Sequence, residues 1–112
     1  MEINIAISAL SALAQETRLD TFRRLMRCLP KGIAAGDLAD QVGVPANTMS
    51  THLAILTRAG LVQSDRQGRT VYYSADLDGI RNLLQFLVKD CCRGKTEACN
   101  KLLDAVLPSC CP

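Results

Sequence analysis

The stretch GDLADQVGVPANTMSTHLAILTRAGLV, residues 36–62, decides the fold of this chain. Apolar residues four apart predict a short helix that ends at Gly43. After a Val-Pro link, a second helix is predicted over about residues 46–59, and Gly60 follows in the position of a C-terminal glycine. Two helices joined by a short turn that contains glycine are typical of a helix-turn-helix.

A hairpin is predicted directly after these helices, in VQSDRQGRTVYYSAD, residues 62–76. The run TVYYS has strong strand propensity, and RQGR makes the turn. A hairpin in this place is the wing of a winged helix-turn-helix. Arg66 and Arg69 at its tip suit the DNA minor groove or the adjacent backbone, although an ordinary charged turn has the same composition.

The second helix has a polar outer face. A step of about 100° per residue places Met49, Leu53 and Leu56 on the inner side and polar residues opposite them. Such side chains hydrogen-bond base edges or phosphates. His52 lies nearer the inner side, which favours packing or a phosphate contact over base reading. The candidate DNA-contacting residues of this helix are Asn47, Thr48, Ser50, Thr51, His52 and Arg58.

Apolar stripes predict three further helices. The first covers residues 3–14, the second begins with Thr17 as its N-cap and ends before Pro30, and the last covers residues 77–92 with Asp76 as its cap. The last stripe is long and very apolar, and so small a monomer has little surface with which to cover it. A dimer interface is therefore expected there. The predicted fold class is mainly α with a small β-hairpin.

Composition bounds the remaining possibilities. A chain of 112 residues with 48% hydrophobic and 21% charged residues is expected to form one globular domain, residues 1–112. Basic residues gather in residues 18–31 and 58–69, which suits a polyanion but equally a solvated helix face. The N-terminus does not resemble a signal peptide and no run is long enough to span a membrane, so a cytoplasmic protein without a membrane partner is expected.

Six cysteines then need a reason other than disulfides, because cytoplasmic thiols stay reduced. The stretch DCCRGKTEAC, residues 90–99, holds three of them. Cys91 ends the apolar stripe, Cys92 lies about 100° further round, and Cys99 begins a new helix after a glycine break. Three converging thiolates suit a thiophilic ion. A redox disulfide such as Cys92–Cys99 is the nearest alternative, and Cys91 or Cys99 alone would fit a core.

Three segments together resemble the ArsR/SmtB family of metal-sensing repressors: ALAQETRLDTFRRL, the helix-turn-helix stretch itself, and RQGRTVYYSAD. The resemblance covers roughly residues 8–90. It implies a winged helix-turn-helix homodimer, joined through its first and last helices, whose apo form represses its own operator and whose metal-bound form releases it. It also implies that Asn47, Ser50, Thr51 and His52 face the DNA.

Members of that family sense different ions at different places. The segment IAAGDLAD here lacks the Cys-Val-Cys motif of one arsenic-sensing group, and DLDGIRNLLQFLVKD lacks the histidines of the zinc sensors. Some arsenic-responsive members carry C-terminal cysteines, so the resemblance favours As(III) held by Cys91, Cys92 and Cys99. Cys110 and Cys111 are either accessory ligands or thiols without a role, and Cys28 is expected in the core.

The sequence thus predicts a repressor of an arsenic-resistance operon, with operator DNA, a second copy of the chain and trivalent arsenic as partners. Sb(III), methylated arsenite or another thiophilic metal are alternative inducers, and no organic cofactor is expected. A thiol enzyme is disfavoured because there is no C-x-x-C motif and no histidine near the thiols. A metal carrier without a DNA role is the remaining rival. The predicted regions are a DNA-binding core at about 33–74, dimerisation helices at about 3–14 and 77–92, and a cysteine-rich segment at 90–112.

Overall fold

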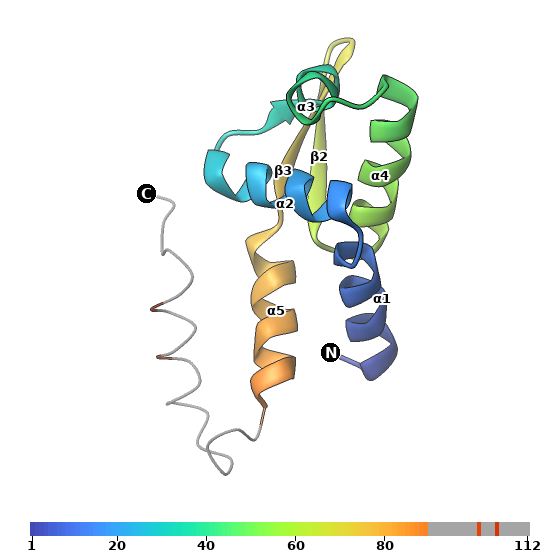
Figure 1. Ribbon diagram of the computed structural model, residues 1–112. Coiled ribbons are helices and arrows are strands. Elements are labelled where there is room, and N and C mark those ends of the chain that lie inside the picture. The colour runs from blue at the N-terminus through green and yellow to red at the C-terminus, as the bar shows by residue number, and fades with distance from the viewer. Residues whose placement is uncertain (90–100, 102–104, 106–112) are drawn as a thin grey trace.

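The computed structural model describes residues 1–89, 101 and 105 (Figure 1). Cys91, Cys92, Cys99, Cys110 and Cys111 lie outside the described residues. The elements within residues 1–89 are α1 (Ile3–Leu13), α2 (Glu16–Cys28), β1 (Ile33–Ala34), α3 (Ala35–Val42), α4 (Ala46–Arg58), β2 (Val62–Gln67), β3 (Thr70–Ala75) and α5 (Leu77–Val88). This mainly helical chain with a small sheet confirms the predicted fold class.

The predicted ends of α3 and α4 and the predicted cap of α5 are confirmed, whereas α5 ends at Val88 and not at the predicted residue 92, because the backbone of Lys89 is extended. Gly43 and Gly60 follow α3 and α4 with φ of 82° and 80°, the left-handed conformation in which glycine avoids the strain of a side chain. Asp76 caps α5, where its Oδ1 accepts a hydrogen bond from the backbone N–H of Gly79 at 3.2 Å. Asp76 therefore ends the hairpin and starts the last described helix.

The predicted cap of α2 is wrong. Thr17 lies inside the first turn of α2, and Gln15 is the N-cap, with Oε1 accepting from the backbone N–H of Arg18 at 2.8 Å. Gln15 has an extended backbone, with φ of −151° and ψ of 133°, which lets its longer side chain reach the third residue of the helix. The carbonyl of Thr17 instead accepts a hydrogen bond from the hydroxyl of Thr21 at 2.7 Å.

The wing is a two-stranded hairpin to which a third strand is added. Pairing of Gln67 with Thr70 closes the turn at Gly68, whose φ of 64° suits glycine. In the antiparallel sheet, ordered β1-β3-β2, the two-residue β1 pairs with Tyr72 and Tyr73. The sequence did not predict β1, because so short a strand is stabilised by its neighbour rather than by its own residues.

The core joins the helix-turn-helix to the sheet. Its largest fully buried apolar side chains are Leu25, Leu38, Met49, Leu53, Leu56, Leu61 and Leu83. Each comes from a helix, or from the turn before β2, that packs against the others. This aliphatic cluster fixes the direction in which α4 presents its outer face.

The fully buried residues of helix α1 are all alanines, and Leu13 at its end is partly buried against the core. Ala6, Ala9 and Ala12 are buried, whereas the larger residues Ile3 and Ile7 of the predicted stripe are 63% and 56% exposed. The predicted stripe is therefore divided: Ala6 and Leu13 pack on the chain's own core, whereas the larger residues Ile3, Ile7 and Leu10 face away from it.

Two further features concern the ends of α2 and α5. Cys28 is exposed, so its predicted place in the core is wrong; it is the last residue of α2, and its neighbour Leu29 packs against the core instead. Gly79 of α5 packs directly on the main chain after α4, and a Cβ at this position would overlap the carbonyl oxygen of Gly60. That contact places α5 against the corner between α4 and β2.

No helix in residues 1–89 combines the length and the apolar character that a membrane crossing requires.

Candidate nucleic-acid interface

Helix α4 separates a buried face from a polar one. Met49, Leu53 and Leu56 are fully buried, which confirms the predicted inner face. The opposite side carries four exposed candidates, and its flanks carry two that are half-buried. The exposed ones are Asn47, Ser50, Thr51 and Arg58, and the half-buried ones are Thr48 and His52. The structure therefore brings the six predicted residues of this helix onto one element, with their polar groups outside the core.

The first turn of α4 is open to a ligand. Pro45 precedes the helix and offers no side-chain cap, since proline carries no hydrogen-bonding side chain. Asn47 Oδ1 accepts from the backbone N–H of Thr48 at 3.0 Å, and Thr51 Oγ1 donates to the carbonyl of Asn47 at 3.2 Å. These hydrogen bonds orient two polar side chains at the positive end of the helix dipole, where phosphate groups bind well.

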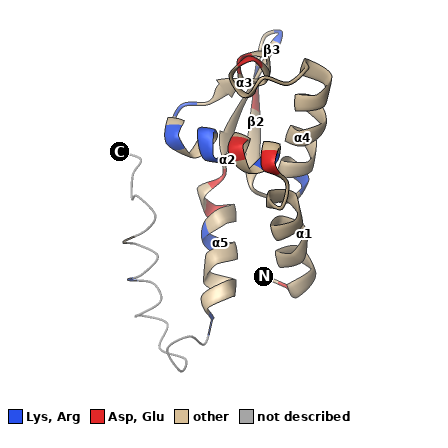
Figure 2. Ribbon diagram, in the orientation of Figure 1, with Lys and Arg blue, Asp and Glu red and all other residues tan. Residues whose placement is uncertain are grey.

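The wing presents its arginines at the tip of the hairpin. Figure 2 shows the basic tip beyond the acidic Asp65 in β2. Gln67 donates to the Asp65 carboxylate at 3.1 Å, and Arg66 Nε donates to the carbonyl of Gly68 at 3.4 Å. Arg69 is exposed and makes no hydrogen bond or ion pair within residues 1–89. Its charge is therefore available to a phosphate.

His52 is held by an arginine that the sequence pattern did not single out. Its Nδ1 lies 3.4 Å from an Nη of Arg18, whose Nε donates to the carbonyl of Ala12 at 2.7 Å. Burial, and then the positive charge of Arg18, lower the pKa of His52 below 6.5. His52 thus favours its neutral form and connects α4 to the junction of α1 and α2. The sequence showed Arg18 only as part of a basic run, because contacts 34 residues apart leave no local signal.

Within residues 1–89, 101 and 105, no three His, Cys, Asp or Glu side chains gather as metal ligands would. The predicted thiol site lies outside these residues.

Comparison with known proteins identifies the arrangement. Residues 13–65 match the model of a helix-turn-helix domain. The chain is 34% identical over 76 residues to the transcriptional repressor SdpR of Bacillus subtilis, a match that covers 62% of this chain and 84% of SdpR. The chain belongs to the helix-turn-helix family of transcriptional regulators.

Solved structures place it within that family. NolR from Sinorhizobium fredii is 34% identical, with a TM-score of 0.61, over 76% of this chain and 82% of NolR. Mb0332 from Mycobacterium bovis, described as a homodimeric winged helix-turn-helix domain and a possible ArsR-family regulator, is 25% identical, with a TM-score of 0.65, over 80% of this chain and 83% of that one. The chain therefore has the winged helix-turn-helix fold of an ArsR-like neighbour. It spans 66% or less of the length of the curated relatives KmtR of Mycobacterium tuberculosis and NolR of Rhizobium meliloti.

Proposed function

We propose that this protein is a DNA-binding transcriptional repressor that acts as a homodimer and leaves its operator when As(III) binds its C-terminal thiols. One observation carries the DNA-binding part of the proposal. The side of α4 opposite the buried Met49, Leu53 and Leu56 is polar and exposed, and the basic tip of the wing follows it in the same domain (Figure 2).

Helix α4 acts as the recognition helix in the major groove. Its N-terminal turns carry the amide and hydroxyl groups of Asn47, Ser50 and Thr51, which hydrogen-bond base edges and phosphates. Thr48 and His52 lie at the flanks of this face, and Arg58 in its last turn suits a backbone phosphate. Arg66 and Arg69 of the wing contact the adjacent minor groove or backbone.

The dimer forms through α1 and α5. Ile3, Ile7 and Leu10 of α1 are 63%, 56% and 42% exposed, and Leu87 of α5 is 51% exposed. Water-facing apolar side chains of this size on two helices that contact each other are typical of an oligomer interface. A second copy would cover them and set two α4 helices in successive major grooves. The homodimeric neighbour Mb0332 supports this arrangement.

The inducer is trivalent arsenic, and its ligands are Cys91, Cys92 and Cys99, with Cys110 and Cys111 as accessory thiols. The support is chemical, since soft thiolates select thiophilic ions and this segment contains no imidazole. The segment follows α5, the helix of the proposed interface, so ligand binding there can alter how the two subunits pack. Release of the operator needs a coupling of about 1–3 kcal/mol between the two sites.

The test uses the full chain and a fluorescent fragment of the promoter upstream of its own gene. Tight binding is expected without arsenite, and arsenite is expected to lower the affinity roughly fivefold to 150-fold. A variant with serine at Cys91, Cys92 and Cys99 should bind DNA and ignore arsenite. If the triple serine variant still loses DNA affinity with arsenite, the thiol site is refuted. If the wild type does not bind the promoter fragment, the proposed repressor function is refuted.

A parallel titration with antimonite and methylated arsenite ranks the alternative inducers. Peroxide treatment distinguishes a redox switch. If peroxide releases the protein from DNA and arsenite does not, the thiols act through a disulfide and not through bound arsenic.

A further inference from the structure

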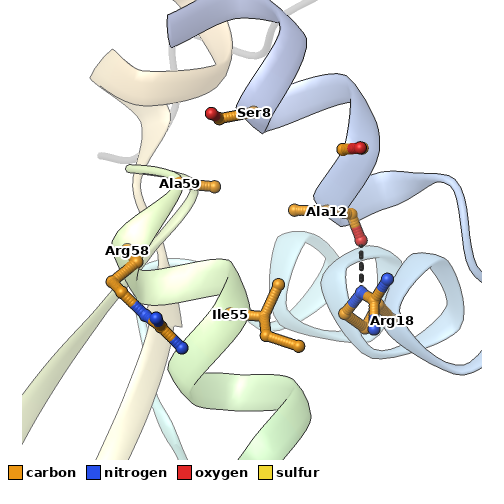
Figure 3. Close-up of a pocket in the computed structure, with 7 residues that line it drawn as sticks. Ser8, Ala12, Arg18, Ile55, Arg58 and Ala59 are labelled. Carbon is orange, nitrogen blue, oxygen red and sulfur yellow. Dashed lines mark hydrogen bonds between the residues drawn. The ribbon is translucent and has the colours of Figure 1, made fainter.

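A pocket of about 440 Å³ lies where α1, the start of α2 and the end of α4 meet (Figure 3). Four of its lining residues are polar and none is acidic: Ser8, Ser11, Arg18 and Arg58. A volume in this range suits a small organic molecule. Two guanidinium groups without a carboxylate among the lining side chains make the pocket electropositive.

The two arginines lie on either side of Ile55 in Figure 3. Arg18 is fixed in place, because its Nε donates to the carbonyl of Ala12 at 2.7 Å and an Nη lies 3.4 Å from His52 Nδ1. Its other Nη has no protein acceptor within residues 1–89. Arg58 makes no hydrogen bond or ion pair in the same part of the chain. The pocket therefore holds one pre-positioned and one unused guanidinium group.

The remaining lining is apolar. Ile55 lies between the two charges, with Ala12 and Ala59 beside it. Polar groups that fix orientation, set in an otherwise apolar wall, are typical of small-molecule sites. An inorganic ion alone would leave this wall uncovered, whereas a molecule with an anionic head and an apolar body contacts both parts.

We propose that this pocket binds a small organic anion. The guanidinium groups of Arg18 and Arg58 hold its carboxylate or phosphate group, the hydroxyls of Ser8 and Ser11 add hydrogen bonds, and the apolar part packs on Ile55. Guanidinium groups are the preferred protein partners of both oxyanions, because their N–H donors match two oxygen atoms at once.

The pocket borders both surfaces already described, because Arg58 belongs to α4 and Ser8 and Ser11 belong to α1. Ser8 lies at least about 100° around α1 from Ile3, Ile7 and Leu10, whereas Ser11 lies about 40° from Ile7, at the edge of the proposed dimer interface. Arg58 is eleven residues from Asn47, or about 16 Å along α4, so the pocket adjoins the end of the recognition helix away from its N-terminal turns.

The anion also has a way to affect DNA binding, and this part rests on the proposed function. Arg58 cannot hold a DNA phosphate and the anion at the same time. An occupied pocket therefore removes about one phosphate contact per subunit and weakens operator binding in a salt-dependent way.

The binding test needs no DNA and uses His52, the only histidine of the chain, as the reporter. Its imidazole proton resonance is followed by NMR in the full-length protein while benzoate or phenyl phosphate is added. A saturable shift is expected, with half-saturation at about 1 mM or less. The pKa of His52 should rise, because an anion beside Arg18 offsets the charge that lowers it. Benzamide, the neutral analogue of benzoate, should give no such shift.

Arg58→Gln is expected to weaken both anions roughly tenfold or more, the usual value of a charge-assisted hydrogen bond. Arg23→Gln removes the same charge from an exposed site outside the pocket and should leave binding unchanged. Ser8→Leu fills the pocket without changing the charge and should abolish binding. The relative affinities of benzoate and phenyl phosphate identify the preferred head group.

The proposal is overturned if neither anion gives a saturable shift, if benzamide equals benzoate, or if Arg58→Gln binds as tightly as the wild type. The promoter fragment then tests the coupling. Binding of the anion with unchanged DNA affinity overturns the regulatory part alone. A protein that binds the anion but no DNA refutes the proposed function and leaves the site intact.

Discussion

The contact between Gly79 and Gly60 gives the sharpest stability prediction. A Cβ at Gly79 would overlap the carbonyl oxygen of Gly60, and the obstructing atom belongs to the main chain, so no side-chain rotation relieves it. Forcing extra volume into a packed contact costs about 1–3 kcal/mol of stability. Because the backbone cannot move aside as a side chain can, we expect a cost at the upper end, about 3 kcal/mol. Alanine recovers about 1 kcal/mol of helix propensity. Gly79→Ala should therefore lower the free energy of unfolding by about 2 kcal/mol.

Gly36 provides a matched control. It also lies in the first turn of a helix, α3, but a Cβ added there meets no atom within 4 Å. Gly36→Ala should therefore stabilise the protein by about 0.5–1 kcal/mol. The two variants differ only in what the added methyl group meets, and their stabilities should differ by about 2.5–3 kcal/mol by the estimates above.

The assay is urea unfolding followed by far-UV circular dichroism, at one protein concentration because a dimer gains stability by mass action. Equal midpoints for the two variants would refute the argument, since both would then report helix propensity alone. A lower urea midpoint for Gly79→Ala, with an unchanged dependence of the unfolding free energy on urea, would support a close, rigid contact between α5 and the main chain that follows α4.

Three further predictions concern the dimer, the wing and pH. Ile7→Asp should give a monomer by light scattering, because it places a charge in the proposed interface, whereas Leu19→Asp on α2 should remain dimeric. Arg69→Gln should weaken promoter binding and reduce the slope of log affinity against log salt by about 0.9 per lost phosphate contact, with Arg23→Gln unchanged. The pKa of His52 is lowered on folding, so the unfolded chain binds a proton at this residue more readily than the folded chain does. The contribution of His52 to stability is therefore present above about pH 6.5 and is lost as the pH falls. Wild type should therefore lose more stability than His52→Gln between pH 8 and pH 5, and parallel losses would refute this.

Periodicity predicted the parts of the fold that depend on one helix at a time. The phase of Met49, Leu53 and Leu56 fixed the inner face of α4, and with it the outer polar face. The hairpin followed from strand propensity and a glycine turn, and the cap at Asp76 from its side-chain oxygen. Each of these features is set by residues close together in the chain.

Features that depend on contacts between distant segments of the chain could not be predicted from the sequence. The strand at Ile33–Ala34 exists because β3 pairs with it. The contact between Arg18 and His52 depends on how α1, α2 and α4 pack, and the pocket beside it depends on the same packing. Cys28 has an apolar neighbour in sequence, Leu29, which packs against the core, yet Cys28 itself is exposed at the end of α2. The thiol site proposed from the sequence stays a prediction.

The attachment of α1, in which alanines are the only fully buried residues, has a consequence for gene control. Only three methyl-sized side chains, Ala6, Ala9 and Ala12, and the partly buried Leu13 pack this helix on its own subunit, and a helix of 11 residues is marginal by itself in water. In the proposed dimer, formation of α1 and association of the subunits then become a single concentration-dependent equilibrium. Promoter occupancy would rise more steeply than in proportion to the amount of protein made. In the proposed repressor of its own gene, a fall in protein concentration would then separate the subunits and restart synthesis of the protein.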